Sequence, residues 1–275
     1  MWSRTVANTV TYLLLGLGAL ITLAPCLLSV QTSLKTPQQF AAASPFAPPA
    51  PPSTGSYAAL TVGEHTLFPP LVITMQVVIV VVLGQLTCSV LAAYAFACLD
   101  LPGREWLFRV YLGTLTVPLT ATLVPRFVLV SGLGLRDTFA GIVLPTLFGS
   151  PYAIFLLRQF FRGIPADLLD AARIDGAGHL RVLRHVVLPL SRPVLATLLI
   201  ITVVTHWNEF LWPLIITSGE RWRVLTVAVS ALQSQHNGDW TLVMAATTLA
   251  TCPLLILFVL FQKHIVRSIT ITGLK

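Results

Sequence analysis

Residues 170–189 read DAARIDGAGHLRVLRHVVLP, a polar stretch in a chain that otherwise consists largely of long apolar runs. It holds three elements at fixed intervals: Asp170-Ala171-Ala172, then Gly176 after three residues, then Val186-Val187-Leu188-Pro189 after nine more. Acidic residues favour the start of a helix, and glycine favours a sharp turn. The pattern therefore predicts a helix, a glycine elbow at Gly176, and a second short helix over about residues 178–187 that ends at Pro189.

The composition of the chain indicates a membrane protein. Of its 275 residues, 55% are hydrophobic and only 10% are charged, and the mean hydropathy is +0.83. Soluble domains carry roughly 25% charged residues. The net charge of +7 does not point to nucleic acid as a partner, because the basic residues fall in short loops beside apolar runs.

Six segments are apolar and long enough to cross a bilayer, which takes about 20 helical residues. They run approximately over Val10–Val30, Val72–Ala95, Val110–Val130, Phe139–Leu157, Val194–Ile216 and Val243–Phe261. The predicted fold class is an all-α polytopic membrane protein with six transmembrane helices. An even number of spans places both termini on the same side of the membrane.

The distribution of lysine and arginine gives the predicted orientation. With the N-terminus in the cytoplasm, the inner segments hold twelve basic residues and the outer segments hold four, while Arg126 lies within a span. Cytoplasmic loops carry the excess of positive charge in membrane proteins. Both termini are therefore predicted to be cytoplasmic, with one transmembrane domain over residues 1–275.

Two connections between the spans are long. The first, residues 31–70, is rich in proline and is predicted to be an extended external loop with a short helix in its later part. The second, residues 158–193, contains the polar stretch quoted above and is predicted to be cytoplasmic. Its length and its amphipathic pattern exclude a simple turn.

The spacing within residues 170–189 resembles the EAA loop of ABC-importer permeases, in which Glu-Ala-Ala, Gly and Ile-x-Leu-Pro follow at the same intervals. In that family this loop lies between the fourth and fifth helices and forms the coupling helix that docks a separate ATPase. Amphipathicity alone would favour a helix that merely rests on lipid headgroups, but the full spacing reverses that preference. The resemblance implies these ATPase-docking residues: Asp170, Ala171, Ala172, Asp175, Gly176, Leu188, Pro189 and Lys275.

Further motifs extend the resemblance over nearly the whole chain. They are Thr32-Ser33-Leu34-Lys35, Gly132-Leu133-Gly134-Leu135 with Asp137-Thr138, Trp207-Asn208-Glu209-Phe210-Leu211-Trp212-Pro213, and Thr272-Gly273-Leu274-Lys275. These are similar to the carbohydrate-importer branch, the MalG-like permeases. The resemblance implies a multi-pass protein of the bacterial plasma (inner) membrane. It also implies three protein partners: a second homologous permease, a dimeric ABC ATPase, and an external sugar-binding protein that is periplasmic or lipid-anchored.

The sequence contains no phosphate-binding loop of the form G-x-x-x-x-G-K-[ST]. We therefore expect no cofactor on this chain, with ATP and Mg bound by the partner ATPase. No metal site or catalytic residue is predicted, because the four cysteines lack metal-ligand spacing and the motifs of membrane hydrolases are missing. The alternative function is a secondary transporter of small polar solutes, which would need an ion-coupling acid near the bilayer midplane.

Four residues in the predicted spans are candidates for the translocation path. Counting residues along spans three and five places Arg126 and Glu209 at similar depths in the membrane. Charged side chains within a membrane are functional candidates. We expect them to pair, or jointly to line a polar path, and a purely structural ion pair is an equal alternative. Trp207 and Asn208 could hold a sugar by stacking and hydrogen bonding, although an interfacial tryptophan belt explains Trp207 more simply.

Overall fold

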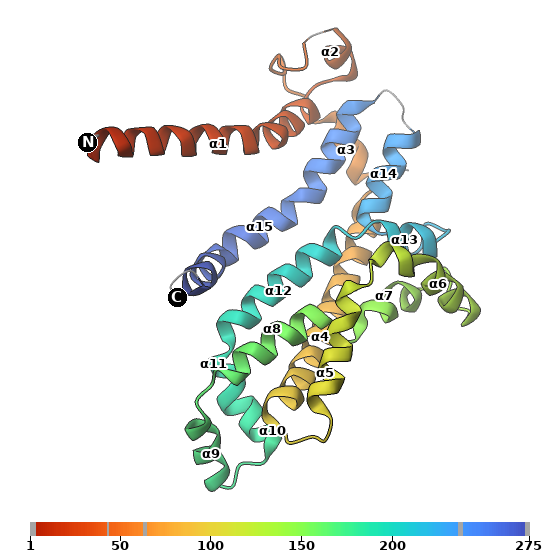
Figure 1. Ribbon diagram of the computed structural model, residues 1–275. Coiled ribbons are helices and arrows are strands. Elements are labelled where there is room, and N and C mark those ends of the chain that lie inside the picture. Colours follow the sequence, from red (N-terminus) through yellow and green to blue (C-terminus); the bar gives the residue numbers. More distant parts are fainter. Residues whose placement is uncertain (1–3, 43, 63–64, 236–238, 273–275) are drawn as a thin grey trace. The chain divides into compact units, whose positions relative to one another are not determined.

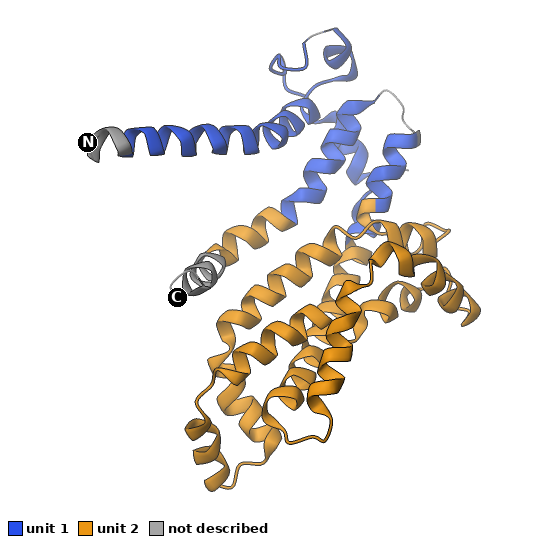
Figure 2. Cartoon of the chain, viewed as in Figure 1, with its two compact units in different colours: residues 1–71, 227–253 blue, residues 72–226, 254–275 orange. Residues whose placement is uncertain are grey.

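The computed structural model describes residues 4–42, 44–62, 65–235 and 239–272, and these ranges contain helices and no strand. The all-helical fold class is therefore confirmed. The chain divides into two compact units, one of residues 1–71 and 227–253 and the other of residues 72–226 and 254–275 (Figure 2). The boundaries between the units fall inside α4, α14 and α15. The single domain over residues 1–275, with 31–70 external and 158–193 cytoplasmic, stays a prediction.

The helices differ widely in length, from single turns to more than thirty residues (Figure 1). In chain order they are α1 (Arg4–Ser33), α2 (Pro37–Ala42), α3 (Gly55–Thr61), α4 (Phe68–Cys98), α5 (Arg104–Gly113), η1 (Thr114–Thr116), α6 (Leu119–Gly132), α7 (Phe139–Leu147), α8 (Pro151–Arg162), α9 (Ala166–Ile174), α10 (His179–Val182), η2 (Leu183–Val187), α11 (Leu188–Leu190), α12 (Arg192–Trp207), α13 (Leu211–Ile216), α14 (Leu225–Gln235) and α15 (Trp240–Thr272).

Four stretches are long and apolar enough to cross a membrane, and two bent helix pairs raise the number to six if each pair is one span. The four are Asn8–Ser33, Phe68–Cys98, Phe139–Arg162 and Trp240–Gln262. The bent pairs are Arg104–Thr116 with Leu119–Gly132, at 100°, and His179–Leu190 with Arg192–Trp207, at 81°. These stretches correspond to the six predicted spans, but three of those spans are not continuous straight helices.

The interruptions have local causes in the sequence. Between α5 and α6 the chain passes through the 3-10 turn η1 and then Pro118, whose backbone is extended, because proline cannot donate the hydrogen bond that a continuing helix needs. Between α7 and α8, Ser150 caps the second helix and Pro151 occupies its first turn. The helix predicted over Val194–Ile216 ends at Trp207, and α13 begins only at Leu211.

The proline-rich segment of residues 31–70 is more ordered than an extended connector, since it contains α2 and α3. Lys35 is only 2% exposed, and its Nζ donates to the carbonyl oxygens of Ser44 and Pro45 at 3.4 and 3.1 Å. Gln31 donates to the carbonyl oxygen of Phe46 at 3.0 Å. These bonds hold the segment back against the end of α1, because the buried ammonium group of Lys35 needs acceptors and these carbonyl oxygens supply them. The segment between the predicted spans Val194–Ile216 and Val243–Phe261 likewise contains a helix, α14.

The second unit contains two buried apolar clusters. One lies among α4, α5, α8, η2 and α12 and includes Phe108, Leu157 and Phe161; the other lies among α4, α6, α7 and α13 and includes Val81, Ile142 and Trp212. In Figure 1, α9 and α10 lie at one end of this unit, and α6, α7 and α13 lie at the other. The sequence from α10 through α12 connects the two ends.

A buried arginine joins three helices in the first of these clusters. The side chain of Arg158 on α8 donates from Nε to the carbonyl oxygen of Phe96 on α4 at 3.2 Å, and its Nη2 pairs with Glu105 on α5. Its guanidinium carbon also lies 3.8 Å from the ring centroid of Phe108. Arg158 is only 3% exposed, so its guanidinium has lost most of its contact with water and these three partners stabilise it instead. Because the partners come from α4 and α5, the contacts hold α4, α5 and α8 together as one group.

We predict that Arg158→Ala lowers the free energy of unfolding by about 3 kcal/mol, because it removes a buried side chain together with its hydrogen bonds to Phe96 and Glu105 and its packing on Phe108. Arg104 provides the control, since its ion pair with Asp100 at 3.3 Å is exposed and contributes less than about 1 kcal/mol. Thermal unfolding of the purified variants in detergent measures both changes. Equal destabilisation by Arg158→Ala and Arg104→Ala would contradict the role assigned to Arg158.

Candidate functional site

A cavity of the second unit lies where its helices are interrupted. It has a volume of about 630 Å³ and is lined from α4, α6, α7, α8, α12 and α13 and from residues in or next to the three interruptions. Leu119 and Thr120 line it just after the first break, Phe148 to Ser150 within the second, and Glu209 within the third. Non-helical backbone is tolerated at membrane depth only where protein covers it or a water-filled cavity borders it. The three breaks therefore mark a space inside the membrane-spanning unit that both apolar and polar side chains line.

Side chains satisfy the backbone groups that the breaks release. The hydroxyl of Tyr111 donates to the carbonyl oxygen of Gly149 at 2.7 Å, and the backbone N–H of Ser150 donates to Oγ of Ser89 at 3.1 Å. The hydroxyl of Thr226 donates to the carbonyl oxygen of Glu209 at 2.8 Å. A buried backbone group without such a partner is costly, so these bonds fix the cavity wall in place.

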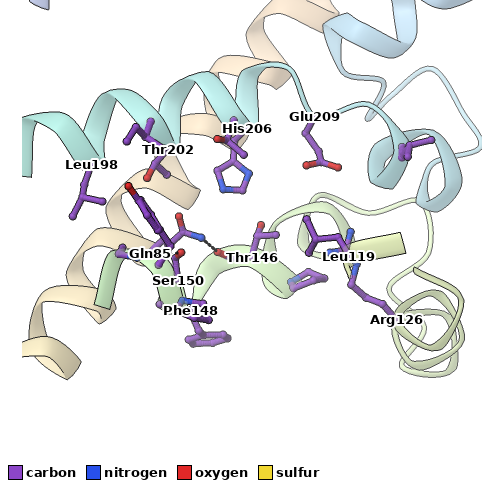
Figure 3. A pocket seen from close by; sticks show the side chains of 18 of the residues that line it. Gln85, Leu119, Arg126, Thr146, Phe148, Ser150, Leu198, Thr202, His206 and Glu209 are labelled. Atoms are coloured by element: carbon purple, nitrogen blue, oxygen red, sulfur yellow. Dashed lines mark hydrogen bonds between the residues drawn. The ribbon is translucent and has the colours of Figure 1, made fainter. Parts of the chain in front are cut away.

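Charged and polar side chains enter the cavity from opposite sides (Figure 3). The carboxylate of Glu209 and the imidazole of His206 are directed into it from the end of α12, and Arg126 extends towards it from α6. Gln85 on α4 donates from Nε2 to the carbonyl oxygen of Thr146 at 3.1 Å. The arrangement offers both donors and acceptors to a polar molecule.

Arg126 and Glu209 line the same cavity, as one of the two predicted arrangements requires, but they form no direct ion pair among the described residues. The guanidinium carbon of Arg126 lies instead 3.7 Å from the ring centroid of Trp212. The residue counts assume straight helices, whereas α5 and α6 are bent by 100° and Glu209 lies beyond the end of α12, so their similar depth in the membrane stays a prediction. Whether cargo passes between the two charges stays a prediction.

Trp207 and Asn208 do not line the large cavity. Trp207 is 4% exposed and borders a separate space of only about 20 Å³, whereas ligand pockets usually measure about 300–1,000 Å³. The side chain of Asn208 donates from Nδ2 to the carbonyl oxygen of Val204 at 2.9 Å, and so caps its own helix. The geometry therefore gives these two residues packing and capping contacts rather than contacts with the cavity.

The predicted glycine elbow is present between α9 and α10. Gly176 has a φ of 79°, in the left-handed region that side chains resist. The backbone N–H of Ala177 donates to the carbonyl oxygen of Ala172, and that of Gly176 to the carbonyl oxygen of Arg173, both at 3.0 Å. This pair of bonds is the Schellman arrangement that ends a helix.

After the elbow, the helical turns continue past Pro189 to Leu190, so the predicted end at Pro189 is wrong. Pro189 lies in the first turn of α11, where proline is tolerated.

The residues of the predicted docking set divide into two groups. Asp170, Ala171, Asp175, Gly176 and Pro189 are exposed, whereas Ala172 and Leu188 pack against the first apolar cluster. Large apolar side chains near the elbow are exposed as well, with Ile174 at 86% and Leu180 at 72%. An exposed set of apolar and polar side chains beside an anchored helix has the character of a protein-docking surface. Lys275 lies outside the described residues.

Arg173 ties the elbow to the transmembrane helices. Its Nη1 donates to Asp170 at 3.0 Å, and its Nη2 donates to the carbonyl oxygen of Cys98, the last residue of α4, at 3.4 Å. A displacement of α9 therefore acts on the end of α4 through one side chain.

In the described ranges no group of three or more His, Cys, Asp or Glu side chains could hold a metal ion.

Sequence reasoning missed most of the cavity wall. Gln85, Thr146, Ser150, Thr202 and Thr205 line it, and none was singled out. One signal was available: Gly149-Ser150-Pro151 is a turn, cap and helix-start pattern inside an apolar run. Its presence in a predicted span marks an interruption.

We predict that cysteine at the cavity-lining position Thr205 reacts with a water-soluble maleimide, since a thiol reacts as thiolate and ionises only in contact with water. Cysteine at the neighbouring Val204, which is exposed but lies outside the cavity lining, should not react when the protein is in a lipid bilayer. Labelling is measured by mass spectrometry after Cys26, Cys88, Cys98 and Cys252 have been replaced by serine or alanine. Absence of labelling in the Thr205→Cys variant would show that the cavity is not hydrated.

Comparisons with known proteins agree with this architecture. A family model described as "binding-protein-dependent transport system inner membrane component" matches residues 65–271. The arabinooligosaccharides transport system permease protein of Bacillus subtilis is 34% identical over 187 residues, which cover 68% of this chain and 66% of that protein. The sn-glycerol-3-phosphate transport system permease protein of Agrobacterium fabrum is 30% identical over 282 residues, which cover 98% of each chain.

A solved structure matches almost the whole fold. It is the crystal structure of a bacterial ABC transporter involved in the import of the acidic polysaccharide alginate. The TM-score is 0.84 at 25% sequence identity, and the match covers 96% of this chain and 98% of that chain. From the family model and these relatives, together with the apolar helices, this chain belongs to the family of inner membrane components of binding-protein-dependent transport systems.

Proposed function

We propose that this chain is one of two permease subunits of an ATP-driven carbohydrate importer of the bacterial inner membrane. It forms half of the translocation path and converts ATP hydrolysis by a separate ATPase into alternating access. The observation that carries the proposal is that the exposed elbow and the cavity belong to one compact unit. Within it the chain runs from the elbow through α10, η2 and α11 into α12, which lines the cavity.

Helix α12 provides the mechanical connection. Its N-terminal end follows α10 and α11, which leave the elbow, and its C-terminal end carries His206 and leads to Glu209 in the cavity. Sixteen residues of α-helix span roughly 24 Å at 1.5 Å per residue. Because a helix is stiff along its axis, a movement of the elbow that passes the 81° bend between α11 and α12 is carried along α12 to the cavity wall.

The ATPase is the proposed occupant of the elbow surface. The exposed members of the docking set, Asp170, Ala171, Asp175, Gly176 and Pro189, would contact it, while Ala172 and Leu188 anchor the loop to the transmembrane helices. The chain itself is non-catalytic in this proposal. ATP and Mg are bound by the ATPase dimer, because this sequence carries no phosphate-binding loop.

Two further partners complete the proposed importer. A second, homologous permease closes the translocation path from the other side, and an external sugar-binding protein delivers cargo. The name of the family supports dependence on a binding protein. The cargoes named for the relatives are arabinooligosaccharides, sn-glycerol 3-phosphate and alginate, which are sugars or polyol derivatives and differ in charge.

The left-handed conformation of Gly176 gives a test of coupling. Gly176→Ala places a side chain at φ 79°, which costs roughly 1–2 kcal/mol, although open space surrounds the position. We expect this cost to weaken docking of the ATPase. ATP-driven uptake by the assembled importer should then fall by about tenfold for each 1.4 kcal/mol of docking free energy that is lost. Uptake into proteoliposomes and co-purification of the ATPase are the two measurements.

Two variants separate the backbone effect from the added volume. Gly178 also has open space around it but an ordinary φ of −68°, so Gly178→Ala should leave uptake nearly unchanged. Gly176→Asn should retain more uptake than Gly176→Ala, because asparagine tolerates the left-handed region. Full uptake and ATPase binding by Gly176→Ala would remove the elbow from the mechanism.

A further inference from the structure

The cavity contains an arginine whose donors are not all used. Nε of Arg126 is buried, and no acceptor within the described part of the chain forms a hydrogen bond with it. A buried N–H group without an acceptor is unfavourable and calls for an explanation in a folded protein. Arg126 also lines the cavity, so a molecule in that space can reach its guanidinium.

Trp212 fixes the guanidinium in place. The guanidinium carbon lies 3.7 Å from the indole centroid, and Trp212 is 1% exposed. The indole Nε1–H is itself shared by the carbonyl oxygens of Gly141 and Ile142, each at 3.2 Å. The stacked face of Arg126 is thus covered by a rigid ring. Because Nε is buried, the N–H donors of the two terminal nitrogens are the ones that stay available, in the plane of the guanidinium, for a planar or tetrahedral oxyanion.

Glu209 leaves those donors available, because it lines the cavity without pairing directly with Arg126. Figure 3 shows its carboxylate directed into the same space from the end of α12. A carboxylate accepts hydrogen bonds from hydroxyl groups, and a guanidinium donates to oxyanions. The two charges therefore suit a polyol that carries one anionic group.

We propose that this cavity binds the cargo directly and that Arg126 selects carbohydrates bearing an oxyanion, either a carboxylate or a phosphate ester, over neutral ones. This rests on the proposed function, in which cargo passes through this subunit. The volume of about 630 Å³ falls within the range of about 300–1,000 Å³ of small-molecule sites. Carboxylate and phosphate present similar oxygen pairs to a guanidinium, so the geometry names their shared chemistry.

The test measures binding to the assembled importer in lipid nanodiscs, without ATP and without the external binding protein. The melting temperature is followed while glucuronate, sn-glycerol 3-phosphate, glucose or glycerol is added at constant ionic strength, because a ligand that binds only the folded state raises it. We expect at least one anionic probe to stabilise the wild type more than its neutral counterpart. In Arg126→Gln the apparent affinity for that probe should fall by at least about tenfold, as expected for the loss of a charge-assisted hydrogen bond.

Two more variants make the result specific. Arg126→Lys keeps the charge but loses the planar fork, so it should bind the anion with an affinity between those of the wild type and Arg126→Gln. If Arg126→Gln does not assemble, Arg126→Lys decides. Arg136→Gln is the matched control, because Arg136 bonds to Ser218 at 3.2 Å and does not line the cavity. It should bind like the wild type.

Each outcome has a definite meaning. Stabilisation by glucuronate alone identifies a carboxylate site, and stabilisation by sn-glycerol 3-phosphate alone identifies a phosphate site. The inference is overturned if neither anion stabilises the wild type more than its neutral counterpart does. It is also overturned if every Arg126 variant that assembles, Arg126→Lys included, binds the anionic probe with the affinity of the wild type. Failure to co-purify an ATPase contradicts the proposed function instead, and it is seen before any ligand is added.

Discussion

A membrane-spanning chain must satisfy its backbone N–H and C=O groups without water, and this constraint governs where the second unit can depart from helical structure. Its three interruptions are tolerated because side chains and the cavity supply the missing partners. Tyr111, Ser89 and Thr226 each bond to the chain at or beside a break. The cavity is therefore a consequence of where the helices are allowed to stop, and the functional candidates Arg126 and Glu209 lie beside those stops.

Rigidity is distributed unevenly around this cavity. Arg158 binds α4, α5 and α8 into one group through Phe96, Glu105 and Phe108. Helix α12 has no comparable ionic tie among the described residues, and it follows the elbow helices across a bend of 81°. An importer driven from the cytoplasm needs one element that moves and a frame that does not. In this chain α12 suits the first role and the α4–α5–α8 group suits the second.

The sequence was sufficient for the apolar helices and for the elbow, because both depend on local patterns. Hydropathy identifies segments that can reside in lipid, and Gly176 has the left-handed φ that its place after an amphipathic helix requires. Breaks are harder to place than spans for a physical reason: hydropathy measures side chains, whereas a break is a property of the backbone. Pro118 and Gly149-Ser150-Pro151 carry that signal, but the break at Asn208 and Glu209 contains neither glycine nor proline. Depth estimates from residue counts share this weakness, since they assume straight helices.

The separation of Arg126 from Glu209 is the least expected feature of the site, because two opposite charges in a low-dielectric space attract strongly. The stack on Trp212 explains how they stay apart. The indole is held by two carbonyl oxygens and is almost fully buried, so the guanidinium gains a fixed partner on one face and cannot turn to Glu209 without losing it. A direct ion pair between Arg126 and Glu209 would use the donors of one and the acceptors of the other, and neither would then be available to a molecule in the cavity. Holding them apart instead keeps a donor and an acceptor exposed to the same space, which is the arrangement that a polar cargo needs in order to replace its water of hydration.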